Sequence, residues 1–282
     1  MKRQILLLAG LCLVLSGWAQ SDTTGKKALP TPANDTIRVG GLVIVRNGGA
    51  IRGDSAYIRI RGRRAGRSDY KPSNISTNWI ILDIGFANIN DRTNYASPSA
   101  QQFAPGATSD WFNLRTSKSV DVNIWLFMQR LNLVNHVVNL KYGFGIELNN
   151  YRYTQNIKYL TNPTRVIMDT INYSKNKLAV DYVTVPLMLN FNFTPGRRND
   201  GFGLSTGVSV GYRYSSRQKF KSSEYGKKKT FDNFDLNPWK LSYIAELQLG
   251  PIKLYGSYAA QSMFKKGLDQ IPYTVGIRFS NW

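Results

Sequence analysis

A regular alternation of side chains over residues 181–193 is the feature that most constrains the fold of this chain. Valine, leucine and phenylalanine occupy every second position from Val183 to Phe193, whereas tyrosine, threonine, methionine, asparagine and one proline lie between them. A period of two is typical of a β-strand with two different environments. The run exceeds the ~5 to 6 residues typical of soluble sheets and reaches the ~9 to 11 needed to cross a bilayer at a tilt. It therefore predicts one strand of a membrane barrel.

The same alternation recurs in seven further segments. In each segment one parity is apolar and carries no acidic or basic residue between its ends, as lipid requires, because a basic residue there costs roughly 2 to 4 kcal/mol at the bilayer midplane. We therefore expect an all-β fold, an eight-stranded antiparallel transmembrane β-barrel. The expected strands are residues 79–87, 120–129, 138–149, 181–193, 202–214, 239–249, 252–259 and 273–280.

Long polar connections alternate with short turns between these segments. In bacterial outer-membrane barrels long loops face outward, short turns face the periplasm, and an even strand number returns both termini to the periplasmic side. The sequence therefore predicts a bacterial outer-membrane protein with its N-terminus and C-terminus in the periplasm. Two alternatives remain open: a soluble exported lipocalin-like binder of a hydrophobic ligand, with the apolar face turned inward, and a small passive pore. The long connections are 90–118, 154–180 and 215–237, and the short ones are 133–136, 195–200 and 250–251.

The N-terminal part has a different character. It opens with the basic, apolar and small-residue zones of a secretory signal peptide, and Cys12, the one cysteine of the chain, lies within them. The mature chain then has no thiolate for a disulfide or a metal. Two short β-like runs, 36–46 and 56–61, flank the turn signal Asn47-Gly48-Gly49 and predict a small hairpin. The expected division is a signal peptide, 1–19, a periplasmic leader, 20–77, and the barrel, 78–282.

The charge balance is strongly basic. The chain has 37 lysines and arginines against 17 acidic residues, and loss of Lys2 and Arg3 with the signal peptide leaves a net charge of +18. No recognition motif, zinc spacing or basic helix favours nucleic acid, so we expect outer-membrane lipid, lipopolysaccharide and envelope proteins as partners. Two basic segments are either solvated or contact anionic envelope components such as lipopolysaccharide phosphates. They contain Arg59, Arg61, Arg63, Arg64 and Arg67, and Lys227, Lys228 and Lys229.

The polar parity of the eight segments carries charges of both signs. The interior of an eight-stranded barrel is narrow, and buried charges need partners there. We therefore expect ion pairs that close the lumen, which argues against an open pore. The candidates are Asp83, Asp121, Lys141, Glu147, Arg213, Glu246, Lys253 and Arg278.

Residues for catalysis are scarce. His136 is the one histidine and falls in an expected short periplasmic turn, away from the outer rim where small barrel enzymes place catalytic groups. The chain has no HExxH, P-loop or paired Cys/His spacing. The lumen carboxylates could form a catalytic acid and base, but ion pairing accounts for them better. We expect no enzyme activity, no cofactor and no metal.

Three stretches resemble a known family. They are Tyr182-x-x-Val185-Pro186-Leu187-x-Leu189, Gly143-Phe144-Gly145 in the preceding strand, and the aromatic final segment from Tyr273 to Trp282. Together they make residues 78–282 similar to the outer-membrane β-barrel domain proteins of Bacteroidetes-type bacteria, the PorT-like group. The resemblance implies an outer-membrane barrel and, as a partner, envelope secretion machinery.

Two residues test the barrel interpretation locally. Pro186 cannot donate to a strand ladder, and a closed barrel has no free edge for it, so we expect a bulge or a missing inter-strand bond there. Barrels of the resembled kind end with an aromatic residue on the lipid-facing parity. Phe279 has that parity and Trp282 does not.

Overall fold

The computed structural model describes residues 35–39, 42–46, 73–195 and 201–280. The chain divides into two compact units, residues 1–68 and 69–282. In the first unit, β1 (Asp35–Val39) and β2 (Leu42–Arg46) pair antiparallel. The hairpin thus lies within the first expected β run instead of spanning Asn47-Gly48-Gly49. The signal peptide and the second run, 56–61, lie outside the described residues.

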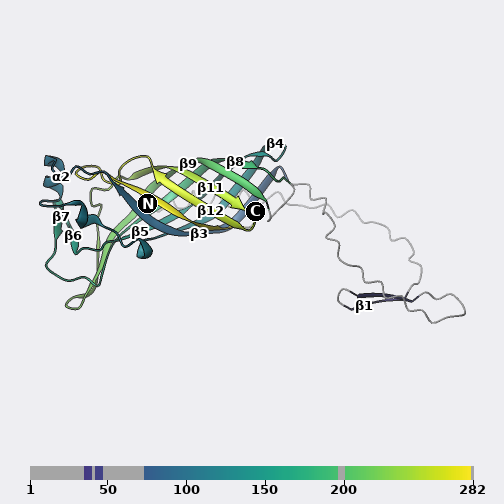
Figure 1. The fold of residues 1–282 in the computed structure, drawn as a ribbon, viewed down its shortest axis with the longest axis horizontal. Coiled ribbons are helices and arrows are strands. Elements are labelled where there is room, and N and C mark those ends of the chain that lie inside the picture. The colour runs from purple at the N-terminus through teal and green to yellow at the C-terminus, as the bar shows by residue number, and fades with distance from the viewer. Residues whose placement is uncertain (1–34, 40–41, 47–72, 196–200, 281–282) are drawn as a thin grey trace, which may run out of the picture. The chain divides into compact units, whose positions relative to one another are not determined.

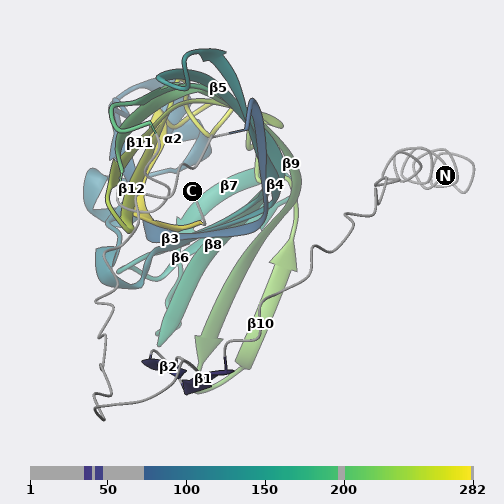
Figure 2. The same cartoon turned by 90° about the vertical axis from the view of Figure 1, so that its right-hand side faces the viewer.

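Eight antiparallel strands of the second unit form a ring (Figures 1 and 2). Each strand pairs with the next along the ring, and β13 pairs with β3 from Gln270 opposite Asp91 to Phe279 opposite Leu82, which closes it. The predicted eight-stranded barrel is confirmed. Its strands are β3 (Ile75–Asp91), β4 (Val120–Val134), β5 (Val138–Arg152), β8 (Lys175–Asn192), β9 (Phe202–Ser222), β11 (Trp239–Leu249), β12 (Ile252–Ala259) and β13 (Gln270–Phe279).

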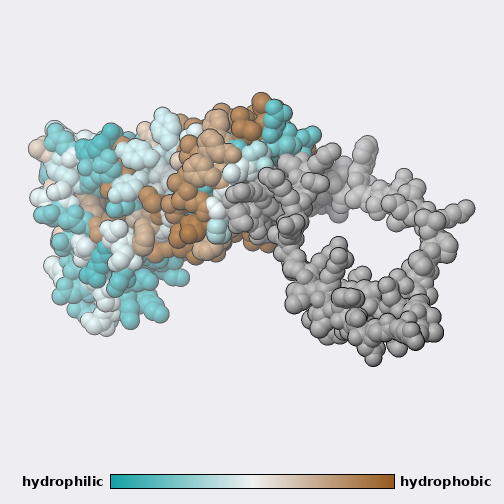
Figure 3. All heavy atoms as spheres, turned by 45° about the vertical axis from the view of Figure 1, so that its right-hand side comes forward, coloured by the Kyte–Doolittle hydropathy of each residue, from teal (hydrophilic) through white to brown (hydrophobic). Residues whose placement is uncertain are grey.

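The two parities of these strands face opposite sides of the ring. Trp79, Val185 and Ile277 are exposed on the outside, whereas Asp83 and Lys141 are almost fully buried. Figure 3 shows hydrophobic residues gathered in a band over the barrel and hydrophilic residues over one end. A soluble lipocalin-like barrel requires the opposite arrangement, so that alternative is disfavoured. Among the described helices, none has the length and apolar character to cross a membrane.

The two ends of the ring differ. One end, here called the turn end, carries the short connections, and the other, the loop end, carries the long ones. The long connections are more ordered than expected, because β8 begins at Lys175, inside the expected loop 154–180, and β9 continues to Ser222, inside the expected loop 215–237. They also contain α2 (Pro98–Phe103), two 3₁₀ helices, η1 (Ser109–Phe112) and η2 (Thr116–Lys118), and β6 (Ile157–Thr161), β7 (Thr164–Met168) and β10 (Gly226–Phe231).

The ladder between β5 and β8 is interrupted at Pro186, where the sequence predicted an irregularity. Pro186 pairs with Ser209 of β9, but the pairing of β8 with β5 omits Val185 and Pro186 and resumes in the same register. The missing bond expected at Pro186 is confirmed, without a bulge, because proline has no N–H to donate. At the end of the chain Phe279 lies on the outward parity and is exposed, while Trp282 lies outside the described residues.

Two irregularities shift the faces of individual strands. Ile80 of β3 has a φ of 54°, an unusual value for a β-branched residue, and no partner in β4, so it lies outward together with Trp79. The second irregularity lies between β8 and β9. Asp181 of β8 pairs with Ser215 of β9 and Tyr182 of β8 pairs with Arg213, so Tyr214 of β9 is an extra residue without a partner in this ladder. Beyond Tyr214 the outward parity of β9 therefore changes from even to odd residue numbers.

Candidate functional site

The lumen holds a network of charges, here called the lumen network, centred on Arg278. Its Nε and Nη2 atoms each donate to a different carboxylate oxygen of Asp83 at 2.7 Å, and its Nη1 atom donates to Glu246. Lys141 Nζ reaches the other oxygen of Glu246 at 2.7 Å. Trp125 Nε1 donates to Asp83 at 2.7 Å. Strands on opposite sides of the ring are thereby linked through charge-assisted hydrogen bonds.

A second group of polar side chains lies nearer the loop end. Lys240 Nζ contacts Glu147 Oε2 at 2.6 Å and lies 5.2 Å from the centre of the Tyr182 ring. Asp121 accepts hydrogen bonds from Tyr255 Oη and, at 3.0 Å, from Asn123 Nδ2. A cavity of about 20 Å³ lies among Asp121, Glu147 and neighbouring side chains, which is room for about one water molecule.

The structure brings together five of the expected ion-pair residues, Asp83, Lys141, Glu147, Glu246 and Arg278, with Lys240 as the partner of Glu147. The partner Lys240 was not among the candidates. Lys240 lies two residues before Ser242, on the same polar face of the strand, and this position would have identified it as a lumen residue.

Three other candidates form no ion pair among the described residues. Asp121 accepts from the neutral donors above. Arg213 donates to Ser216, Asn233 and Leu236, because the connection after β9 folds back over it at the loop end. Lys253 donates to the carbonyl and hydroxyl oxygens of Ser280 at 2.8 and 2.7 Å, since it sits at the turn end beside the last residues of β13. For these three residues the structure gives neutral partners in place of the expected ion pair, as far as the described residues extend.

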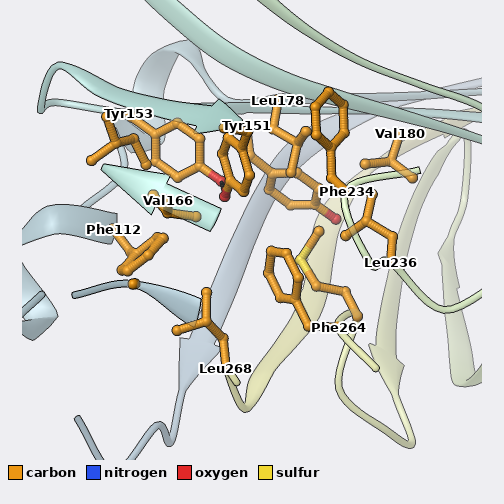
Figure 4. Close-up of a cluster of buried hydrophobic side chains, with 14 of the residues drawn as sticks. Phe112, Tyr151, Tyr153, Val166, Leu178, Val180, Phe234, Leu236, Phe264 and Leu268 are labelled. Carbon is orange, nitrogen blue, oxygen red and sulfur yellow. Dashed lines mark hydrogen bonds between the residues drawn. The ribbon is translucent and has the colours of Figure 1, made fainter. Parts of the chain in front are cut away.

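A hydrophobic cluster, here called the loop-end cluster, is buried at the other end of the ring (Figure 4). Tyr151 and Leu178 of the ring strands contribute to it, together with Val166 of β7 and residues of the later connections. Rings of the cluster meet directly: Tyr159 lies 5.4 Å from Phe234, centroid to centroid, in an edge-to-face arrangement. Phe112 of η1 is also buried in this cluster.

A basic surface lies on the outside of the strands beyond Tyr214. Arg152, Lys177, Lys219 and Lys229 lie opposite one another across β5, β8, β9 and β10, so their side chains share one face. A second row consists of Lys175, Lys221 and Lys227, and Arg217 lies on the other side of the first row. These residues form what we call the outward basic face: Arg152, Lys175, Lys177, Arg217, Lys219, Lys221, Lys227 and Lys229.

The pairing of β10 with β9 places the three lysines of the expected cluster, Lys227, Lys228 and Lys229, on two different faces of the hairpin. Lys227 and Lys229 belong to the outward basic face, whereas Lys228 pairs with Phe220 on the opposite side of the hairpin and lies 4.6 Å from the centre of the Tyr225 ring. The arginine cluster Arg59, Arg61, Arg63, Arg64 and Arg67 lies outside the described residues. Expected lipid contacts at either cluster remain predictions.

Burial and crowding of like charges perturb the outward basic face. Burial, followed by the charges of Lys175, Lys219 and Arg217, lowers the pKa of Lys177 to about 8. Burial and the neighbouring Arg217 and Lys229 also lower the pKa of Lys219. Among the described residues, the salt bridge on this face joins Arg217 to Asp181. The face therefore carries a surplus of positive charge.

The described residues contain no cluster of three or more histidine, cysteine, aspartate or glutamate side chains with metal-binding geometry. His136 lies in the turn between β4 and β5, as expected, with its backbone N–H donating to Asn132 Oδ1 at 2.7 Å. This turn is at the opposite end from the outward basic face and the loop-end cluster.

The closed antiparallel ring with an apolar outer face and a charged interior defines a membrane β-barrel. Comparison with protein families matches residues 88–260 to the outer membrane protein beta-barrel domain. The chain belongs to this family, and an outer-membrane location follows from it. The finer resemblance to the PorT-like group is not part of this match.

Comparison with curated proteins gives no match. Among solved structures, the chain is similar to Ail, the attachment invasion locus protein of Yersinia pestis, solved in complex with the heparin analogue sucrose octasulfate. The identity is 13%, the TM-score is 0.30, and the alignment covers 72% of this chain and 98% of Ail. A likeness this weak says nothing about what the present chain binds.

Proposed function

We propose that this chain is a non-enzymatic outer-membrane barrel with a closed lumen, whose loop end faces the outside of the cell and whose role is to bind a partner in the envelope. The observation that carries the proposal is the filling of the ring. Arg278, Asp83, Glu246 and Lys141 link opposite strands, and the loop-end cluster lies beyond them. Paired side chains that reach across the ring occupy the space through which a solute would have to pass.

Planar-bilayer recording tests the closed lumen. The purified chain, inserted in a bilayer and verified by protease protection, is expected to give no steady conductance, because its charged side chains are paired across the ring. A wide porin recorded in the same bilayers serves as the control for detection. Steady single-channel steps from the chain would instead support the passive-pore alternative.

Cysteine labelling tests the orientation. Tyr225→Cys places a thiol in the turn between β9 and β10, and Val137→Cys places one in the turn between β4 and β5; both parent side chains are exposed. On intact cells, a membrane-impermeant maleimide is expected to label the first variant and to label the second only after lysis. The reverse pattern would place the loop end in the periplasm and contradict the proposal.

The partner we propose is a component of envelope protein-secretion machinery. What supports it is the resemblance of the Tyr182–Leu189 motif, Gly143-Phe144-Gly145 and the aromatic final strand to the PorT-like group. Crosslinking in native envelopes, followed by identification of the attached protein, tests it. Recovery of a secretion component is the expected result, and repeated recovery of unrelated envelope proteins instead would reject the link.

The absence of catalysis is also open to test. Lipid and peptide hydrolysis assays of the purified barrel are expected to show no turnover above that of the detergent alone. Turnover that His136→Ala abolished would assign a catalytic role to the one histidine and overturn the non-enzymatic proposal.

A further inference from the structure

The outward basic face begins just beyond the aromatic residues that mark a membrane interface. Val183, Tyr212 and Trp239 lie opposite one another, and the rings of Tyr212 and Trp239 are 4.9 Å apart, centroid to centroid. Aromatic girdles of this kind sit at the head-group level in membrane barrels. Arg217 of β9 pairs with Ala179 of β8, which lies four residues from Val183 toward the loop end. At ~3.3 Å per residue this is about 13 Å along the strand. With a strand tilt of about 40°, the row that contains Arg217 lies roughly 10 Å beyond the girdle.

The inner side of the same strands is held in place. Gln218 is fully buried and donates from Nε2 to Ile157 O at 2.9 Å, while its Oε1 atom accepts from the Tyr159 N–H at 3.0 Å. Asn176 Nδ2 also donates to Ile157 O, at 2.6 Å. The extension of β8 and β9 is thereby fixed to β6, so the lysines on its outer side stand on a rigid support. A preformed array binds more tightly than one that must be ordered on binding.

Among the residues that the structure describes, most of the charges on the outer side have no acidic partner. Arg217 pairs with Asp181, and Lys177 donates to Asn150 at 2.6 Å, but the rows opposite Lys219 and Lys221 consist of further lysines. Like charges placed directly opposite one another on a sheet are destabilising. Burial, together with the same crowding, lowers the pKa values of Lys177 and Lys219. An anion with several negative oxygens would relieve this repulsion.

We infer that the outward basic face binds the phosphate groups of an outer-leaflet glycolipid of the lipopolysaccharide type, with the row of Arg152, Lys177, Lys219 and Lys229 as its centre. Position favours this ligand over a soluble polyanion, because the face points sideways from the barrel and its nearest row lies roughly 10 Å beyond the aromatic girdle, above the lipid-exposed band. Phe231, exposed opposite Arg217, adds an apolar surface beside the charges. The inference rests on the proposed function, which places the loop end at the outer leaflet.

Lipid retention by matched charge variants tests the inference. The face variant combines Lys177→Gln, Lys219→Gln and Lys229→Gln. The control variant combines Lys118→Gln, Arg165→Gln and Lys265→Gln, which removes the same charge from exposed loop-end positions outside both the face and the expected lysine cluster. Each full chain is incorporated in nanodiscs of phosphatidylcholine with a small fraction of diphosphorylated lipid A and extracted into detergent. The lipid A retained per chain is then measured by native mass spectrometry.

We expect the wild-type and control chains to retain lipid A and the face variant to retain less by roughly tenfold or more, since lysines near a lipid surface attract its anionic groups. Equal retention by all three chains, or an equal loss in both variants, would overturn the inference, the second because it would show a response to net charge alone. Binding of inorganic pyrophosphate to the detergent-solubilised chain as tightly as lipid A would also overturn it in favour of a free-anion site.

Incorporation separates this inference from the proposed function. Lipid A is present in both leaflets of the nanodisc, so the orientation in the cell does not affect the result. A chain that enters nanodiscs but fails the retention test rejects the glycolipid site alone. A chain that stays in the aqueous fraction without detergent rejects the membrane barrel and the glycolipid site together.

Discussion

The cations inside the ring and those on the outward basic face obey different rules. In the lumen, Arg278 meets two carboxylates and Lys141 and Lys240 one each, all at salt-bridge distance. On the outward face, Lys219 lies between Lys177 and Lys229. Burial of an unpaired charge away from water has a large free-energy cost, whereas solvent screens charges that remain exposed. The comparison indicates that the lumen charges serve the barrel itself and the outer charges serve contact with another molecule.

Removal of a lumen acid should have the largest effect on stability, because the lumen cations depend on their acidic partners and the outer cations do not. Glu246→Gln leaves Lys141 and Arg278 buried with less compensation, so we expect the free energy of unfolding to fall by about 3 to 5 kcal/mol. Urea unfolding in lipid vesicles, followed by tryptophan fluorescence, measures it. Glu224→Gln makes the same chemical change in an exposed turn and should change stability by about 0.5 kcal/mol or less. Equal effects of the two substitutions would show that the lumen network is dispensable.

A charge placed on the apolar band should have the next largest effect. Leu187 is exposed on the outer face of β8, and Leu187→Arg is expected to lower the free energy of unfolding in vesicles by about 2 to 4 kcal/mol. Phe231→Arg adds the same side chain to an exposed outer position of β10, at the level of the outward basic face, and should be nearly neutral. Comparable losses for both would place Phe231 within the hydrocarbon region and contradict the boundary drawn at Tyr212.

Removal of a cation from the outward basic face should leave folding intact. Lys219→Gln relieves repulsion by Lys177, Lys229 and Arg217, so we expect the free energy of unfolding to stay the same or to rise by up to about 1 kcal/mol at low salt. The same vesicle assay at low and high ionic strength measures it, and the gain should shrink with salt. A clear loss of stability would mean that this lysine, like those of the lumen, is held by an acidic partner.

The smallest expected effect is on the titration of Lys177. Its neighbours are Arg152 of β5, Lys175 and Asp181 of β8, and Lys219 and Arg217 of β9. Lys219→Gln removes one positive neighbour, so the pKa of Lys177 should rise from about 8 toward the ordinary value of lysine. NMR of isotope-labelled lysine side chains in micelles measures it. The substitution Lys228→Gln, on the other side of the hairpin, should leave the pKa of Lys177 in place.

The depressed pKa of Lys177 also sets the sign of a pH effect on folding. Because the folded chain releases this proton near pH 8 and the unfolded chain near the ordinary value of lysine, the unfolded state holds more protons between these two pH values. The contribution of Lys177 to the free energy of unfolding therefore rises as the pH increases through that window. In the Lys219→Gln variant the window should become narrower.

The sequence by itself determined the parity of the barrel strands. An outer face in lipid excludes charges from every second residue, so Val183 to Phe193 and its seven counterparts could be read directly, as could the interrupted ladder at Pro186. The expectation that acidic and basic side chains meet in the lumen followed as well, since a narrow interior must bring opposite charges together. Which acid meets which base did not follow, and Lys240 and the neutral partners of Asp121, Arg213 and Lys253 were missed.

Tertiary structure alone decided the arrangement of the loop end. The strand extensions beyond Tyr214 and the hairpin strand β10 have no apolar alternation, because their outer side carries lysine in place of leucine or valine. The extra residue at Tyr214 also reverses the parity of β9. Tyr212, an even-numbered residue, and Lys219, an odd-numbered one, therefore both point outward. Lys227 and Lys229 were thus separated from Lys228 only by the register with β9. Register is set by the buried face and by the geometry of the connecting turn, and in these segments no apolar alternation marks the buried face.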